Sequence, residues 1–479
     1  MPTSIHDSVE VKNELNDDQV LIRLGYQPEF KRELGLWTSF CVSFSLMGLL
    51  TSFASVFIYG LQYAGTGGMA WGWIVAMIPI QCIACSLAEL CSAMPTSGGL
   101  YYAAAFLAPV GYGPLASWIT GWSHWIAQVT GPPSGDYALA SMILAGLSIS
   151  KPSYTPTNTH TFLLSVALLL IHASMASLPT KVLARMNTYG TLVTFFSLIA
   201  VLILIPAQTI RSKRTNPITG QIITRPSTAE VWGTIHNGTD YPDGISILMS
   251  FIGVIWIMSG YDAAFHLSEE CSNANIAAPR AIVMTSTVGG LLGWALQILV
   301  AYTIIDVDSI LDSNLGQPWA SYLLQVLPHQ TALAILALTI SCGLCVGQAP
   351  IITSSRVAYA YARDDCFGPL SKFVKVVNQQ TKTPINAVFF NTTIGIGFLL
   401  LNFAGPVAIN AMFSIGAIAV MVAFSVPILM RVISKASAFE RGPWHLGNFG
   451  RPIGAIGVGF VTLMGPIMCL PAKTGNSLR

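Results

Sequence analysis

Residues 36–62 read LWTSFCVSFSLMGLLTSFASVFIYGLQ, a run without a single charged side chain. A helix needs about 20 mostly apolar residues to cross the hydrocarbon core of a bilayer, so this run is long enough to span a membrane. Its middle carries Ser43, Ser45 and Gly48, small residues that weaken a continuous helix. The run therefore predicts a membrane-spanning helix that is interrupted near its centre.

The rest of the chain has the same apolar character. Of 479 residues, 23 are basic and 21 are acidic, so only 9% are charged, against roughly 25% in soluble domains. Hydrophobic residues make up 53%, and the mean hydropathy is +0.62. This composition excludes a water-soluble globular protein and a mainly disordered chain. Since long apolar runs recur and alternating strand patterns are missing, we expect an all-α, multi-pass membrane protein.

Eleven apolar runs have spanning length and are bounded by charged, Pro or Asn residues. They lie at 36–62, 69–93, 114–149, 161–178, 189–208, 245–265, 281–304, 331–355, 385–404, 407–430 and 452–471. The predicted organisation is a cytoplasmic tail (1–34), a first five-helix repeat (35–208), an extracellular or lumenal loop (209–243), a second five-helix repeat (244–430), and a last part (431–479) with a cytoplasmic loop, the eleventh span and a short outer tail.

Basic residues predict the orientation, because they collect in cytoplasmic loops. Most of the 23 Lys and Arg residues fall in the tail and the inner loops if the N-terminus is cytoplasmic. The first 30 residues contain no apolar stretch typical of a cleavable signal peptide. Asn237, in Asn237-Gly238-Thr239, then lies in the outer loop and is a predicted glycosylation site. We expect the plasma membrane, with a vacuolar or other endomembrane as the alternative.

Two CxxC pairs occur among the nine cysteines, Cys82 with Cys85 and Cys342 with Cys345. Both pairs lie within predicted spans and have no His neighbours, so we interpret them as packing residues rather than a metal or redox site. No cysteine lies in a predicted outer loop, which argues against an extracellular disulfide framework. We predict no metal site, no cofactor and no nucleic-acid partner.

Ionisable residues at membrane depth are functional candidates, because burying a charge in lipid is costly. The acids are Glu89 at the end of span 2, Asp136 inside span 3 and Asp262 inside span 6. His124 and His172 also lie at this depth. We interpret each histidine as a neutral imidazole bonded to a neighbouring backbone carbonyl, with a proton relay as the alternative.

Span 6 is interrupted like span 1. Residues 253–262 read GVIWIMSGYD, in which Ser259 and Gly260 stand beside Asp262. Spans 1 and 6 hold corresponding positions if the chain consists of two repeats of five. Broken helices at such positions expose free N–H groups and half-helix dipoles that suit a carboxylate or another polar solute. Ordinary helix packing through small residues is the alternative.

A third disruption is the segment GPPSGD at residues 131–136. Two prolines inside a span kink it and free carbonyl groups, which is tolerated only where protein or a water-lined cavity satisfies them. We expect Asp136 to face such a cavity. The alternative is a structural kink in which Asp136 caps freed N–H groups.

Three motifs occur in a fixed order along the chain. They are Ala88-Glu89-Leu90 with PTSGGLY at 95–101, GYDAA at 260–264 with HLSEE at 266–270 and Pro279-Arg280, and SSR at 354–356 with ARD at 362–364. With these motifs, the chain from about Gly25 to its end resembles the amino acid, polyamine and organocation permease superfamily. Within that superfamily it resembles the fungal amino-acid permeases of the GABA and choline type.

The resemblance implies a LeuT-type fold, an inverted repeat of five plus five helices with one further helix. Substrate is then held between the unwound parts of spans 1 and 6. The residues expected to bind it are Ser43, Met47, Gly48, Leu49 and Leu50 from span 1, and Trp256, Ser259, Gly260, Tyr261 and Asp262 from span 6. The residues expected to couple protons are Asp136, Asp262 and Glu89.

Two features depart from the family pattern. Members usually have twelve spans, and we count eleven in this sequence, so we expect one span fewer than the family pattern. Some proton-coupled relatives also place a Lys in span 5, and residues 189–208 contain none. That route to proton coupling therefore does not carry over to this chain.

We predict a secondary active transporter that imports an amino acid or a related amine such as GABA, by proton symport with alternating access. Its partners are the amine substrate, protons and the lipid bilayer. A choline or polyamine transporter is the alternative, and a solute sensor that does not transport is a further one. An enzyme is not expected, because motifs such as HExxH and GxSxG are missing.

Overall fold

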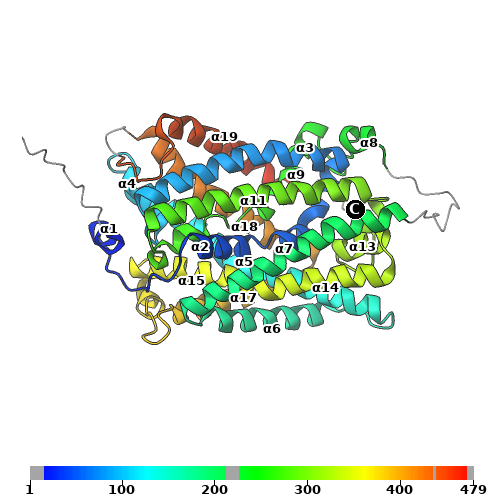
Figure 1. Cartoon of the computed structure of the whole chain (residues 1–479), viewed down its shortest axis with the longest axis horizontal. Helices are drawn as coiled ribbons and strands as arrows, with labels where there is room; N and C mark the ends of the chain where they lie inside the picture. The colour runs from blue at the N-terminus through cyan, green and yellow to red at the C-terminus, as the bar shows by residue number, and fades with distance from the viewer. Residues whose placement is uncertain (1–15, 212–225, 435–438, 472–479) are drawn as a thin grey trace, which may run out of the picture.

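The computed structural model describes residues 16–211, 226–434 and 439–471. These residues are mainly helical, and most of the long helices lie side by side along one direction (Figure 1). The short helices α1 (Asp17–Arg23) and α4 (Gly99–Leu107) lie at one end of the bundle. Helices α8 (Thr228–Gly233) and α13 (Pro318–Val326) lie at the opposite end. We refer to these as the α1 end and the α8 end.

The remaining α-helices carry the predicted spans and their connections. They are α2 (Leu36–Met47), α3 (Leu49–Ala93), α5 (Gly113–Ser150), α6 (Asn158–Ala176), α7 (Thr180–Arg211), α9 (Asp243–Ile257), α10 (Ala263–His266), α11 (Ala274–Thr303), α12 (Asp308–Leu311), α14 (His329–Val346), α15 (Gln348–Arg363), α16 (Ser371–Val374), α17 (Ile385–Leu399), α18 (Pro406–Ile433) and α19 (Gly450–Met468).

The predicted spans agree with these helices. Eight helical stretches of the described chain are long and apolar enough to cross a membrane, and one of them, Leu36–Ala93, contains both span 1 and span 2. The two other predicted spans lie in α5 and α9. Helix α5 carries His124, Gln128 and Asp136 among its apolar residues, and α9 is short because span 6 is interrupted. The all-α, membrane-spanning fold class is therefore confirmed.

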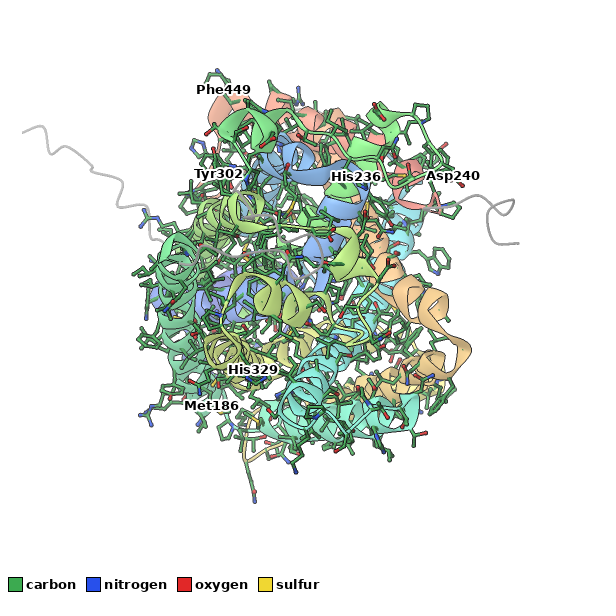
Figure 2. The ribbon with its side chains drawn as sticks, turned by 90° about the vertical axis from the view of Figure 1, so that its right-hand side faces the viewer. Met186, His236, Asp240, Tyr302, His329 and Phe449 are labelled. Carbon is green, nitrogen blue, oxygen red and sulfur yellow. The ribbon has the colours of Figure 1, made fainter. Side chains whose placement is uncertain are left out.

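Helix α3 consists of two helices that meet at a kink at Gly65, between predicted spans 1 and 2. A segment at the α8 end packs directly on this kink. The N–H of Gly67 donates to the Thr234 carbonyl at 3.0 Å, and the N–H of Gly238 donates to the Gln62 carbonyl at 3.0 Å. Figure 2 looks onto this end of the bundle and labels His236 within the segment. The turn between spans 1 and 2 is thus held by main-chain bonds.

Buried ion pairs join three elements near the α1 end. The Arg356 guanidinium on α15 lies 2.8 Å from Glu270 Oε1, and each of these side chains is only 1% exposed. Arg363, also on α15, lies 3.2 Å from Glu269. Glu269 Oε1 also accepts the N–H of Ser97 at 2.8 Å. Residues 268–270 are therefore fixed to both α15 and the segment before α4.

The segment before α2 is anchored to the same region. Asp17 accepts hydrogen bonds from the N–H groups of Asn273, at 2.7 Å, and Ala274, at 3.1 Å, so its carboxylate caps the start of α11. Arg32 donates to the Cys271 carbonyl at 3.0 Å, and Leu34 forms an isolated β-bridge with Cys271. The described N-terminal residues thus bind the connection between α10 and α11.

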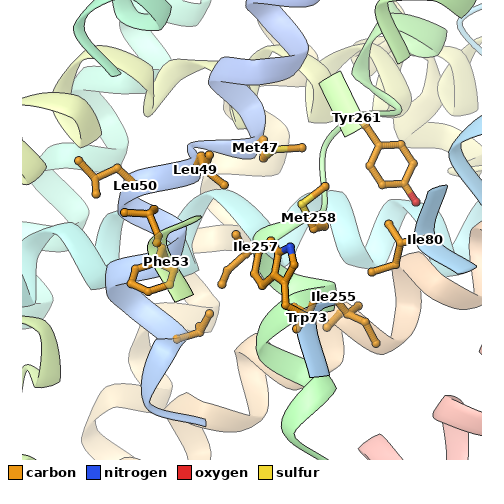
Figure 3. Close-up of a cluster of buried hydrophobic side chains, with 14 of the residues drawn as sticks. Met47, Leu49, Leu50, Phe53, Trp73, Ile80, Ile255, Ile257, Met258 and Tyr261 are labelled. Atoms are coloured by element: carbon orange, nitrogen blue, oxygen red, sulfur yellow. The ribbon is translucent and has the colours of Figure 1, made fainter. Parts of the chain in front are cut away.

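The largest apolar cluster surrounds the interruptions in spans 1 and 6 (Figure 3). Leu49 and Leu50 lie on one side of this cluster, and Ile257 and Met258 come from the end of α9. All four side chains have no exposed surface. Because a close-packed apolar shell resists rearrangement, it fixes the two non-helical segments relative to each other.

Candidate functional site: a cavity between two broken helices

The interruption in span 1 is a single residue, Gly48. Helix α2 ends at Met47 and α3 begins at Leu49, and Gly48 between them has φ +52° and ψ +47°. Thr51 and Ser52 donate their hydroxyls to the carbonyls of Gly48 and Met47, at 2.8 and 2.7 Å. The carbonyls at the break are thus satisfied, while α3 starts without a side-chain cap. Its first N–H groups form the positive end of a helix dipole.

The interruption in span 6 is longer and touches the first. Helix α9 ends at Ile257, α10 begins at Ala263, and Gly260 between them has φ +104°. A Cβ on Gly260 would lie 2.8 Å from Leu46 Cγ and 3.0 Å from the Met47 nitrogen. The Ser43 hydroxyl accepts the N–H of Ala264 at 3.1 Å, which links α2 to α10. Both predicted interruptions are therefore present, and they lie in direct contact.

A cavity of about 150 Å³ lies between these two segments and helices α5, α14, α15 and α18. It is smaller than the roughly 300–1,000 Å³ of pockets for drug-sized ligands, so it suits a small solute. Seven of the predicted site residues line it, namely Met47, Gly48, Asp136, Trp256, Ser259, Gly260 and Asp262. The structure thus brings together residues from three predicted spans around one space.

Five other predicted site residues do not line this cavity. Ser43 is bonded to α10, as described above, and Leu49 and Leu50 belong to the apolar cluster. The Tyr261 ring packs against Phe424 instead, with 5.7 Å between ring centroids. The fifth, Glu89, lies at the end of α3.

Glu89 is engaged in contacts of its own. Its Oε1 accepts the N–H of Leu446 at 3.2 Å, and its Oε2 lies 3.4 Å from Arg431 Nε on α18. The side chain is 1% exposed. The structure therefore places Glu89 in a junction of α3, α18 and the segment before α19, apart from Asp136 and Asp262.

Asp136 pairs with a histidine from the neighbouring helix α6. Its Oδ1 lies 2.7 Å from Nδ1 of His172, and Oδ2 has no hydrogen-bond partner in the described structure. The interpretation of His172 as bonded to a backbone carbonyl left out this aspartate, although His172 does also bond the backbone of Leu344. The side-chain partner of Asp136 is this imidazole rather than an N–H freed at the proline kink. Asp136 faces the cavity, as expected from the sequence.

Asp262 lies between two histidines. Its Oδ2 is 3.2 Å from Nε2 of His124 on α5 and 3.3 Å from Nε2 of His266 on α10. Its Oδ1 has no hydrogen-bond partner among the described residues. The interpretation of His124 as carbonyl-bonded was therefore wrong. Sequence reasoning did not identify His266 as a site residue, although its spacing of four residues from Asp262 places both on one face of a helix.

An aromatic pair closes one side of the cavity. The rings of Trp256 and Phe413 lie with centroids 5.0 Å apart. Phe413 and Gly416 on α18 line the cavity, and so does Gln128 on α5. Sequence reasoning missed these three. Phe413 and Gly416 are ordinary residues of an apolar span, and only the packing of α18 against α5 and α9 brings them here.

Asn237 lies at the α8 end of the bundle, close to the kink in α3. Its amide Nδ2 donates to the Tyr241 carbonyl at 2.7 Å and to Asp243 Oδ1 at 2.9 Å. Its Oδ1 accepts the N–H of Thr239 at 2.9 Å. A glycan on Nδ2 would replace one of the two donated bonds. Glycosylation at Asn237 remains a prediction.

Comparison with known proteins shows to which family the chain belongs. Residues 34–478 match the family described as amino acid permease. The chain belongs to this family. An uncharacterized amino-acid permease of Schizosaccharomyces pombe is 50% identical to this permease over 99% of the chain and 85% of the relative.

Two further relatives widen the comparison. A protein of Candida albicans whose name proposes it as a polyamine transporter is 42% identical, over 97% of the chain and 83% of the relative. The amino-acid permease BAT1 of Arabidopsis thaliana is 30% identical, over 95% and 89%. The permease is therefore an integral membrane transporter rather than an enzyme, as the motifs suggested.

Proposed function

We propose that this permease imports a small amine-bearing solute, an amino acid such as GABA, in symport with protons. One observation carries the proposal. A single small cavity combines the uncapped N-terminus of α3 with the buried carboxylates of Asp136 and Asp262. A zwitterion has the complementary pair of charges, because its carboxylate suits a helix N-terminus and its ammonium suits an aspartate.

The break in span 1 would receive the carboxylate end of the solute. Main-chain groups at Met47, Gly48, Leu49 and Leu50 would bind it. This role does not need the side chains of Leu49 and Leu50, which remain in the apolar core. The break in span 6 would receive the amine at Oδ1 of Asp262, the oxygen without a partner among the described residues. Trp256 would cover the solute.

Asp136 is the group we propose for proton coupling. It faces the cavity, it is 3% exposed, and its second oxygen has no partner in the described part of the chain. A buried carboxylate is costly unless it is paired or protonated, so a proton on the Asp136 and His172 pair changes the charge next to the solute. Glu89 does not line the cavity, so a role for it in coupling would have to act through the junction that it forms with α18.

A polyamine is the second candidate substrate. Two carboxylates in one cavity suit a solute with two ammonium groups, and the Candida albicans relative is named for this class. A polyamine has no carboxylate for the start of α3. The two substrates therefore differ in how strongly transport depends on having both Asp136 and Asp262 in the cavity.

A competition uptake panel separates these candidates. Labelled GABA and putrescine would be offered to transporter-deficient cells at two pH values, with neutral and basic amino acids and choline as competitors. We expect GABA or another amino acid to compete best, with uptake greater at acidic pH. Uptake that is unchanged by a protonophore and by an imposed pH gradient would contradict proton symport.

Two neutral variants test the roles of the acids. We expect Asp262→Asn and Asp136→Asn each to reduce uptake more than 10-fold at normal abundance in the membrane, because each removes a charge facing the solute. Asp312→Asn is the matched control, since Asp312 is exposed and outside the cavity. Normal transport by Asp136→Asn would leave that residue as a structural partner of His172.

A further inference from the structure

Three ligand-type side chains meet at the edge of the cavity. They are His124 from α5, Asp262 immediately before α10, and His266 at the end of α10, and none is more than 3% exposed. One nitrogen or oxygen atom from each lies within 4.8 Å of the others. We propose that these residues bind a divalent transition-metal ion, with Zn²⁺ as the ion that fits best.

The hydrogen bond on the far side of His266 places a hydrogen on Nδ1 of its ring. Nδ1 of His266 lies 3.2 Å from the carbonyl oxygen of Ser97. A carbonyl only accepts, so Nδ1 carries the hydrogen. A neutral His266 then presents the Nε2 lone pair to Asp262 Oδ2, 3.3 Å away. Two acceptors face each other there, and a cation between them removes the conflict.

Nε2 of His124 also lies next to Oδ2 of Asp262. Nε2 of Gln128 lies 3.2 Å from Nε2 of His124, and an amide nitrogen donates. In the tautomer in which His124 Nε2 accepts this hydrogen bond, a second acceptor, Asp262 Oδ2, lies only 3.2 Å from the same atom. Nε2 of His266 and Oδ1 of Asp262 have no hydrogen-bond partner in the described part of the chain. Nε2 of His124, Nε2 of His266 and Oδ2 of Asp262 thus converge, all of them buried atoms.

The distances suit a tetrahedral ion. Zn²⁺ binds nitrogen and oxygen at about 2.0–2.2 Å, which separates neighbouring tetrahedral ligands by about 3.3 Å. The two contacts to Asp262 Oδ2, at 3.2 and 3.3 Å, match this spacing. The imidazoles stack with centroids 4.4 Å apart, so both rings have to tilt out of this stack before their lone pairs meet at one ion.

The surroundings complete a metal site. The Ser97 carbonyl orients His266 from behind, as a carbonyl on the far ring nitrogen commonly does for metal-binding histidines. Two imidazoles and one carboxylate favour Zn²⁺, Co²⁺, Ni²⁺ or Cu²⁺ over Mg²⁺ and Ca²⁺. Asp262 and Gln128 both line the cavity, so an ion bound by this cluster would lie at the edge of the cavity. A metal ion there ties α10 to α5 and occupies the carboxylate proposed for the amine.

Direct binding tests this proposal without reference to transport. The purified full-length permease would be titrated with Co²⁺ alone and followed by visible absorption, where tetrahedral Co²⁺ has intense bands. Isothermal titration with Zn²⁺ would give the stoichiometry. We expect one ion per chain and at least 10-fold weaker binding in His124→Gln and His266→Gln. His172→Gln is the matched control, since His172 is equally buried but lies outside the cluster, and it should bind normally.

A second pair of variants covers the case in which the glutamine variants do not fold. His124→Cys and His266→Cys keep a ligand atom, and they should bind Co²⁺ with an added thiolate charge-transfer band in the near ultraviolet. A wild-type protein without tetrahedral Co²⁺ bands, or binding unaffected by substitution of either histidine, would overturn the proposal and leave protons as the only cations of the cluster. These outcomes are read from metal binding alone, whereas the uptake panel tests the proposed substrate, so the failure of one proposal is distinguishable from the failure of the other.

Discussion

Gly260 is the residue on which the geometry of the site depends most closely. A side chain there is disfavoured twice, by the backbone at φ +104° and by the approach of Leu46 and Met47. The backbone strain alone costs about 1–3 kcal/mol. Relief of the contact requires the two interrupted helices to move apart, which enlarges the cavity between them.

We therefore expect Gly260→Ala to lower the Tm of the purified permease and to abolish uptake. Thermal unfolding in detergent and uptake into cells measure the two effects. Gly459→Ala is the matched control, because Gly459 is helical and a Cβ added there would meet no other atom within 4 Å. An unchanged Tm for Gly260→Ala would show that the two helices are not held in contact.

Single residues of the site differ in how far the sequence reveals them. Asp136, Asp262 and Gly260 stand out because acids and small polar groups are rare in apolar runs. Their partners do not stand out. His172 is 36 residues from Asp136, and His124 is 138 residues from Asp262. Which histidine meets which acid depends on how helices pack, and helix packing in a membrane is not encoded in the local pattern of any one span.

At the scale of elements, the pair Glu270 and Arg356 joins α15 to the connection between α10 and α11. Removing one partner leaves a buried charge, which costs about 3–5 kcal/mol, whereas replacing both with apolar groups can be neutral. We expect Glu270→Gln to lower the Tm strongly, and Glu270→Leu combined with Arg356→Met to recover most of the loss. A double-mutant cycle of Tm values measures the coupling.

The control for this cycle is Glu440→Gln. Glu440 pairs with Arg23 at the surface, where its side chain is 82% exposed, so the loss of this pair should leave the Tm unchanged. Equal effects of Glu270→Gln and Glu440→Gln would contradict a buried, coupled pair.

The cap on α11 provides a second prediction for an element. Asp17 is the only described side chain that accepts from the N–H groups of both Asn273 and Ala274. Loss of a cap costs about 0.5–2 kcal/mol. We expect Asp17→Ala to lower the Tm modestly, while Lys31→Ala, at an exposed position of the same segment, does not. A larger fall for Lys31→Ala would argue against the cap.

Elements were easier to predict from the sequence than their contacts. Apolar length indicated the positions of the spans, and small residues within the runs located both interruptions. The docking of residues 234–238 on the kink of α3 relies on main-chain groups, which any sequence possesses. The packing of α18 behind Trp256 likewise leaves no pattern, because Phe413 and Gly416 look like any other residues of an apolar span.

At the scale of the whole molecule, the orientation in the membrane can be measured with thiols. Cys366 is exposed and lies at the α1 end, close to Asp364, which bonds Tyr26. His329 is exposed at the α8 end (Figure 2). Cys469 is the other exposed thiol of the described chain, so the experiment uses a Cys469→Ser background. If the N-terminus is cytoplasmic, an impermeant maleimide should label Cys366 in this background only after permeabilisation. It should label His329→Cys, with Cys366→Ser also present, in intact cells.

A buried thiol should not react with the maleimide and serves as the unlabelled reference of this experiment. Burial raises the pKa of Cys271 to about 11, so this thiol stays protonated and unreactive at neutral pH. Labelling of Cys366 in intact cells, in the Cys469→Ser background, would reverse the predicted orientation.

The peptide unit at Ser97 bears on how this sequence can change over evolutionary time. Its N–H binds Glu269 and its carbonyl binds His266, whereas its hydroxyl has no partner among the described residues. Nearby, a Cβ on Gly99 would lie 2.9 Å from the Phe265 ring. Because Ser97 is only 1% exposed, a saturation library should tolerate small uncharged side chains at position 97 and almost none at position 99. Within that size limit, the residue of the motif that can change is the one whose backbone holds Glu269 and His266 in place.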